Sequence, residues 1–169
     1  GGAAWSAAAG SAFDYNLDGY PDVAMANGKD ELEPRLWQNL MGYDTFGDQP
    51  VVDVAAKVGL SDGLGLAQGV FANDLNGDGD LDLFLGRQAS TGRMFQNESP
   101  VGSDLPVNHW LGFDLVAAGG NTAVGATVSL ATASLQPLGM QMLDAGSGRG
   151  SQQPYQLIFG LGDLDESVD

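Results

Sequence analysis

One nine-residue pattern, D-x-N-x-D-G-x-x-D, occurs twice in the chain and constrains its fold more than any other feature. The copies occupy residues 14–22 and 74–82, so they begin 60 residues apart. A second block follows each copy in the same order, reading R-L-W-Q-N at residues 35–39 and R-M-F-Q-N at residues 93–97. Two matching blocks in the same order and at nearly the same offset indicate an internal repeat.

The segments around the two acidic patterns have the lengths and turn residues of β-structure. Each pattern leads into a short apolar run, at residues 23–26 and 83–85, and 26 glycines predict many tight turns. One helical turn is expected at residues 52–58, ended by Gly59. From residue 108 onward, short apolar stretches alternate with Gly, Asn and Ser. We therefore predict an all-β fold.

The repeats and the change of texture suggest the domain organisation. We expect residues 1–100 to hold two repeats, at about residues 10–60 and 69–100. Residues 101–107 are small and polar and are expected to form a linker. Residues 108–169 are expected to form a small β-sandwich-like domain.

Composition excludes several classes of partner. The chain has 22 acidic and 6 basic residues, a formal net charge of −16, so it lacks the basic surface that nucleic acids and anionic membranes require. No apolar run reaches the roughly 18–20 residues of a membrane-spanning helix. Cysteine is absent, which excludes disulfides and Cys-based zinc sites.

The spacing within each acidic pattern matches the needs of a calcium ion, which takes six to eight oxygen ligands. Side chains at the first, third and fifth positions of a tight loop converge, and a glycine at the sixth brings round the carbonyl of the seventh. A carboxylate at the ninth position closes the shell. We predict two Ca²⁺ sites: Asp14, Asn16, Asp18, the Tyr20 carbonyl and Asp22 in the first, and Asp74, Asn76, Asp78, the Asp80 carbonyl and Asp82 in the second.

Two alternatives bear on this assignment. An EF-hand would place a glutamate at the twelfth position, where this chain has Met25 and Leu85, so each loop leads into a strand instead. Asp, Asn and Gly clusters also form ordinary polar turns. Two full copies in register favour calcium. Extracellular calcium modules bind with dissociation constants of roughly 10⁻⁴–10⁻³ M, which favours a secreted or cell-surface location.

The two loops and the blocks at residues 35–39 and 93–97 resemble FG-GAP/VCBS repeats, the calcium-loop repeats of integrin-α-type β-propellers and many secreted bacterial proteins. Residues 108–169 resemble the ASPIC/UnbV domain of cartilage-acidic-protein-like sequences, with matches at residues 109–111, 123–128, 148–152 and 159–162. The resemblance implies β-propeller blades that bind calcium outside the cell.

Two blades do not close a propeller, which typically has four to eight. Open sheet edges pair with other chains, so either neighbouring subunits complete the structure or the chain is a piece of a longer protein. The apolar start at residues 1–9 is expected to be a strand donated to a neighbour or a frayed end.

Nothing in the sequence nominates a catalytic site. His109 is the single histidine, and no nucleophile and orienting acid accompany it. Residues 146–150 lack the lysine of a phosphate-binding loop. Trp5, Trp37 and Trp110 offer a carbohydrate platform, although core packing is the simpler interpretation for the last two. We expect a binding or structural protein and no enzyme.

The sequence thus predicts a secreted, calcium-stapled structural protein that assembles with copies of itself into a homo-oligomer or polymer, such as an extracellular fibre or surface layer. The alternative is a fragment of a larger β-propeller that binds an extracellular protein or glycan as an adhesion module.

Overall fold

The structure is a computed structural model. It describes residues 7–28, 33–40, 50–60, 67–88, 90–98, 108–146, 155–164 and 168. This part of the chain contains strands and turns and no helix, so the all-β prediction is confirmed. In the same residues, no helix has the length and apolar character to cross a membrane. The predicted linker at residues 101–107 and Trp5 lie outside the described residues.

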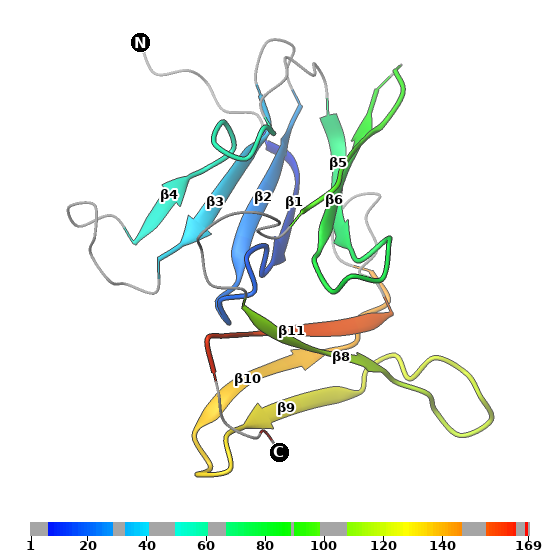
Figure 1. Ribbon diagram of the computed structural model, residues 1–169. Coiled ribbons are helices and arrows are strands. Elements are labelled where there is room, and N and C mark those ends of the chain that lie inside the picture. Colours follow the sequence, from blue (N-terminus) through cyan, green and yellow to red (C-terminus); the bar gives the residue numbers. More distant parts are fainter. Residues whose placement is uncertain are drawn as a thin grey trace.

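The first acidic loop belongs to a four-stranded antiparallel sheet (Figure 1), whose order is β1-β2-β3-β4. Its strands are β1 (Ala7–Phe13), β2 (Asp22–Asn27), β3 (Arg35–Asn39) and β4 (Val51–Asp53). The loop joins β1 to β2. Ala7 and Ala9 pair with β2 of the same chain, so the proposed donation or fraying of the start is wrong for residues 7–9.

The second acidic loop joins the first two strands of a three-stranded sheet that repeats this arrangement. The order is β5-β6-β7, formed by β5 (Ala67–Asn73), β6 (Asp82–Arg87) and β7 (Arg93–Phe95). Val23 of β2 pairs with Trp37 of β3, and Leu83 of β6 pairs with Phe95 of β7. The two sequence blocks are therefore the third strands of two similar sheets.

The predicted helical turn is a single turn that begins later than expected. Val52 and Asp53 pair with β3, so they belong to β4. The Val58 N–H then donates to the Val54 carbonyl (3.0 Å), and the Leu60 N–H donates to the Ala55 carbonyl (2.8 Å). Gly59 has a φ of 76°, the left-handed conformation that ends such a turn. The glycine stop is confirmed and the extent of the turn was overestimated.

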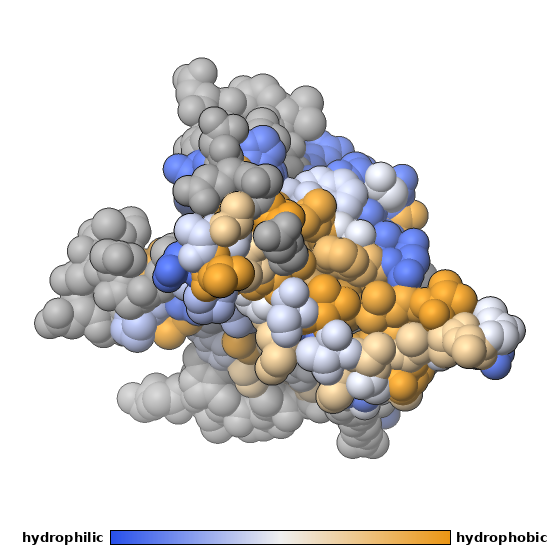
Figure 2. All heavy atoms as spheres, turned by 90° about the horizontal axis from the view of Figure 1, so that it is seen from below, coloured by the Kyte–Doolittle hydropathy of each residue, from blue (hydrophilic) through white to orange (hydrophobic). Residues whose placement is uncertain are grey.

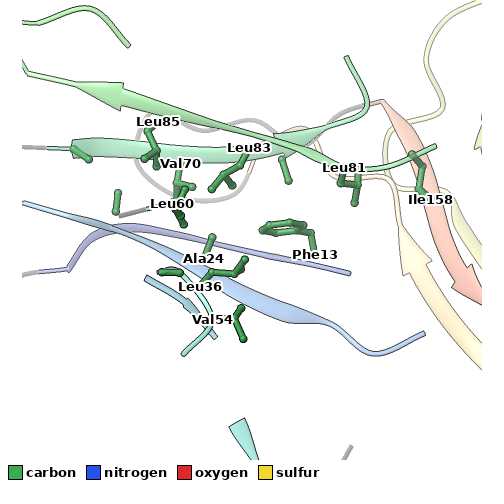
Figure 3. Close-up of a cluster of buried hydrophobic side chains, with 14 of the residues drawn as sticks. Phe13, Ala24, Leu36, Val54, Leu60, Val70, Leu81, Leu83, Leu85 and Ile158 are labelled. Carbon is green, nitrogen blue, oxygen red and sulfur yellow. The ribbon is translucent and has the colours of Figure 1, made fainter. Parts of the chain in front are cut away.

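The two sheets face each other across one hydrophobic core (Figure 3). Phe13, Ala24 and Leu36 of the first sheet meet Val70 and Leu85 of the second. Because side chains alternate across a strand, one face of each sheet is committed to this core. Ile158, from the C-terminal part of the chain, also belongs to the cluster.

The C-terminal residues form two antiparallel strand pairs, β8 with β11 and β9 with β10. The strands are β8 (His109–Asp114), β9 (Thr127–Ala131), β10 (Pro137–Met142) and β11 (Gln156–Gly162). Leu130, Leu143, Leu157 and Phe159 form a second core between the pairs. The rings of Phe113 and Phe159 meet edge to face, with centroids 5.8 Å apart.

The β8–β11 pair lies across the end of the repeat sheets where both acidic loops are found (Figure 1). The Gly162 N–H donates to the Leu17 carbonyl (2.8 Å). A Cβ atom at Gly160 would overlap Asp14 Oδ2 and lie 2.5 Å from the carbonyl carbon of Leu17. In the second loop, a Cβ atom at Gly79 would overlap the indole of Trp110. Glycine at these positions lets strand and loop approach this closely.

Replacing Gly160 with Ala should therefore separate β11 from the first loop. We expect a loss of about 1–3 kcal/mol in the free energy of unfolding, the usual cost of overpacking. Urea unfolding at equilibrium measures this change. Gly86→Ala is the matched control in β6, because its Cβ atom would have no neighbour nearer than 3.8 Å. Equal unfolding midpoints for the two variants would contradict the close approach.

Candidate functional site

Hydrogen bonds from backbone N–H groups to carboxylates shape the first loop. Asp14 accepts from the N–H of Asp18 at Oδ1 (3.1 Å) and from the N–H of Gly19 at Oδ2 (2.8 Å). Asp18 accepts from the Tyr20 N–H at Oδ1 (3.0 Å) and from Asn16 Nδ2 at Oδ2 (2.9 Å). Gly19 has a φ of 90°, which allows the turn that the sixth position requires. The first and fifth carboxylates therefore act as caps of the turn.

The ninth residue of the first loop joins it to the rest of the sheet. Asp22 is 0 % exposed. Its Oδ2 accepts from the N–H of Tyr15 at the start of the loop (3.0 Å), and its Oδ1 accepts from the N–H of Asn39 at the end of β3 (2.7 Å). One carboxylate thus fixes the loop to the third strand.

The second loop repeats these bonds. Asp74 Oδ2 accepts from the Gly79 N–H (3.0 Å). Asp82 is 1 % exposed and accepts from the N–H groups of Leu75 (3.1 Å) and Asn97 (2.9 Å). The ninth aspartates therefore have equivalent partners in both loops, which explains why the acidic pattern and the later block recur together. The first aspartates share the bond from the sixth-position glycine, but Asp74 Oδ1 accepts from the Gly77 N–H (2.7 Å), one position earlier than the equivalent bond of Asp14.

The fifth position of the second loop is also a cap. Asp78 accepts from Asn76 Nδ2 at Oδ2 (2.6 Å) and from the Asp80 N–H at Oδ1 (3.0 Å). Asn76 and Asp78 are exposed to solvent, whereas Asp80 is buried. The middle of the second loop is therefore exposed to solvent, and its end is buried.

The first loop carries negative charge in a poorly hydrated place. Burial raises the pKa of Asp14 to about 6 and that of Asp22 to about 7, and the neighbouring charge of Asp18 adds to both shifts. Burial, followed by repulsion from Asp22, raises the pKa of Tyr15 to about 12. A cation in this loop would offset the unfavourable energy of the ionised carboxylates.

The donor set of the first loop fits a hard cation in its chemistry. The Asn16 Oδ1 atom is buried and has no hydrogen-bond partner, whereas most buried oxygens accept at least one bond. In the second loop, the corresponding Asn76 Oδ1 accepts from the Asp78 N–H (3.1 Å). Across the described residues, however, no three His, Cys, Asp or Glu side chains are arranged to hold a metal ion. Two calcium sites therefore stay a prediction.

The structure connects the two loops through a residue that sequence reasoning treated only as part of a repeat. The Asn97 N–H bonds to Asp82 in the second loop, while its Nδ2 donates to the Tyr15 carbonyl in the first (2.6 Å). The equivalent Asn39 donates from its Nδ2 to the Pro21 carbonyl of its own loop (3.3 Å). The two asparagines look identical in the sequence, and only the packing of the two sheets distinguishes them.

Two further contacts, made by β8 and by the residue that precedes it, were also missed. Asn108 Nδ2 donates to the Asn16 carbonyl in the first loop (2.8 Å). Trp110 rests on Gly79 of the second loop, so this tryptophan anchors β8 against the loop. His109, between them, is exposed. Spacing gives no signal for such contacts, because the partners are far apart in the sequence.

Replacing Asn97 with Ala should loosen the first loop although the substitution lies in the second repeat. The Tyr15 carbonyl would lose its partner, at a cost of about 1–3 kcal/mol in the free energy of unfolding. Hydrogen exchange of the amides of residues 15–20 should become faster. Asn39→Ala is the matched control, because it loses a longer and exposed bond. Exchange in the first loop that responds more to Asn39→Ala than to Asn97→Ala would contradict the connection.

Comparison with known families supports the repeat. Residues 14–85 match the model of the family described as FG-GAP-like repeat. The matched segment includes both acidic loops and the strands between them. No curated protein matches the chain. The match ends before residue 108, so the resemblance of residues 108–169 to an ASPIC/UnbV domain stays a prediction.

Proposed function

We propose that this chain is an extracellular, non-catalytic module of the β-propeller type, in which Ca²⁺ ions stabilise the joint between the repeats and the C-terminal strands. The observation that carries the proposal is the loop structure itself. Two loops of matching sequence make matching hydrogen bonds, and both lie against the β8–β11 pair. An ion bound in either loop would therefore stabilise the interface between that loop and the β8–β11 pair.

The ligands in this proposal are those that the sequence pattern nominates. Asp14, Asn16, Asp18, the Tyr20 carbonyl and Asp22 would hold the first ion. Each carboxylate oxygen has two lone pairs, so accepting an N–H leaves capacity for a cation. Asp74, Asn76, Asp78, the Asp80 carbonyl and Asp82 would hold the second.

Calcium would stabilise the fold by removing charge repulsion. Seven carboxylates occupy the two loops, in a chain whose formal net charge is −16. Binding with dissociation constants of roughly 10⁻⁴–10⁻³ M, as in extracellular calcium modules, fills the sites only where calcium is abundant. That dependence is the physical reason for proposing a location outside the cell or on its surface.

The function of such a module would be to bind an extracellular protein or glycan. The FG-GAP-like match supports a β-propeller-type unit. We propose that residues 108–169 serve as an ASPIC/UnbV-like domain whose β8–β11 pair covers the loop ends.

One observation favours self-assembly as a second candidate function. Among the described residues, the first sheet has four strands and the second has three, so β7 has no partner equivalent to β4. An unpaired edge can accept a strand from another chain. A copy of this chain that supplies the strand would generate the oligomer or fibre expected from the sequence.

Calcium should stabilise the chain measurably. At a calcium concentration 100 times the dissociation constant, each occupied site adds about 2.7 kcal/mol to the free energy of unfolding. Calorimetric titration should give two ions per chain for the wild type and one for Asp78→Ala. Asp163→Ala is the control, because Asp163 is exposed and lies outside both loops. It should still bind two ions.

Two outcomes would overturn the calcium proposal. A chain that takes up no calcium and unfolds identically in calcium and chelator would have loops that are ordinary turns. Loss of both ions in Asp78→Ala would show that the loops form one site, contrary to the assignment of two ligand sets.

Sedimentation velocity in millimolar calcium and in excess chelator separates the two candidate functions. A monomer in calcium supports the binding module and removes self-assembly. A large species that dissociates on chelation supports calcium-dependent assembly.

A further inference from the structure

The chain contains two Asn-Gly sequences, and the structure places them in contrasting surroundings. Asn27 and Gly28 stand at the end of β2, where Asn27 is 4 % exposed and pairs with Ala7 of β1. Asn76 and Gly77 stand in the middle of the second acidic loop, where both are exposed to solvent. Hydrophobic side chains gather over the end of the molecule formed by β9 and β10 (Figure 2), whereas this loop exposes amide and carboxylate groups to water.

An Asn-Gly sequence can react with itself and then with water. Asparagine is among the thermally labile residues, and a following glycine carries no Cβ atom that would hinder the reaction. The backbone nitrogen of the glycine bonds to Cγ of the asparagine and gives up its proton, the Cγ–Nδ2 bond breaks, and the amide nitrogen leaves as ammonia. Water then opens the cyclic succinimide at either carbonyl, which yields aspartate or isoaspartate. Water is the only co-reactant.

The two acidic loops differ at the residue that follows the asparagine. Leu17 in the first loop and Gly77 in the second both have a left-handed backbone, with φ of 59° and 82°. Leucine rarely adopts this conformation, and the side chain of Leu17 is 2 % exposed and packed in the core of the repeats. Gly77 adopts it without strain and without a side chain. The second loop therefore carries the reactive sequence and lacks the core contact that anchors the middle of the first.

Hydrogen bonds engage the reacting groups of the second loop while it is closed. Asn76 Nδ2 donates to Asp78 Oδ2 (2.6 Å), Asn76 Oδ1 accepts from the Asp78 N–H (3.1 Å), and the Gly77 N–H donates to Asp74 Oδ1 (2.7 Å). The reaction requires these bonds to open. Exposed bonds in a loop open at a smaller free energy than those of a paired strand. Asn27 reacts only when β2 separates from β1, so local opening makes Asn76 the faster site.

We propose that Asn76 is a site of spontaneous deamidation in the folded chain, and that this modification opens the second acidic loop. Either product carries a carboxylate where Asn76 Nδ2 donates to Asp78, so a hydrogen bond becomes a repulsion between two negative charges. Gly79 of the same loop carries the contact with Trp110 of β8. Opening the loop therefore loosens its interface with β8. The reaction requires no metal, so the inference does not rest on the proposed calcium sites.

The first test incubates the full chain in mildly alkaline buffer with excess chelator and follows each asparagine by peptide mapping and mass spectrometry. In the folded chain, Asn76 should deamidate at least about tenfold faster than Asn27, because only the loop has to open. In urea, where both sequences are open, the two rates should agree within about threefold. Equal rates in the folded chain, or reaction at neither site while both react in urea, would overturn the proposal.

The hydrogen bond to Asp78 provides a matched pair of variants. Asp78→Ala removes the acceptor of Asn76 Nδ2, so deamidation at Asn76 should become about three- to tenfold faster. Asp163→Ala removes the same charge at an exposed position outside both loops, and the rate should change by less than about twofold. Equal rates in the two variants would contradict control of the reaction by the bonds of the loop.

The effect on the loop is measured with the product already in place. In chelator, Asn76→Asp should make hydrogen exchange of the amides of residues 77–80 and Trp110 at least about tenfold faster than in the wild type. Asn121→Asp makes the same change of charge at an exposed asparagine between β8 and β9, and it should alter exchange of these amides by less than about twofold. Equal exchange in the two variants would overturn the opening of the loop.

Discussion

The buried carboxylate at the ninth position of each acidic loop holds the repeats together. Asp22 and Asp82 each accept one N–H from the start of their loop and one from the end of the third strand of their sheet. A buried carboxylate is stable only when its oxygens are hydrogen-bonded. The loop must therefore be closed and the third strand must be in register for the charge to be tolerated. Loop conformation and sheet register therefore depend on each other in each repeat.

Both loops lie at the interface between the repeat sheets and the β8–β11 pair, whereas polar loops ordinarily face water. Because the ninth carboxylate holds each loop close to its sheet, the loop backbone presents a compact surface at the end of the sheet. The β8–β11 pair packs on that surface through Gly160 and Trp110. Asn97 adds a direct bond between the two loops. The loops thus connect each repeat to the other and to the C-terminal strands.

The sequence predicts those parts of the structure that are determined by residues close together in the chain. The strands after each acidic loop follow from short apolar runs, and Gly59 ends its turn because it adopts a positive φ. The predicted helical turn was wrong at Val52 and Asp53, where pairing with β3 overrode the helical tendency. The interface between the loops and the β8–β11 pair was not predictable, since the contact of Trp110 with Gly79 depends on how separate sheets pack. The cross-connection of Asn97 was hidden because Asn39 has the same local sequence.

The polar-turn and calcium interpretations of the loops concern the same atoms and are compatible. An aspartate that caps N–H groups uses one lone pair of each oxygen and keeps another, so capping orients a carboxylate without consuming it. Capping does not neutralise the negative charge of these buried carboxylates. The raised pKa values of Asp14 and Asp22 express the energy of holding two carboxylates where water is scarce. Protonation or a bound cation would each relieve that energy, and a cation would at the same time give the orphaned Asn16 Oδ1 a partner. The first loop therefore presents the stronger physical case for a bound ion.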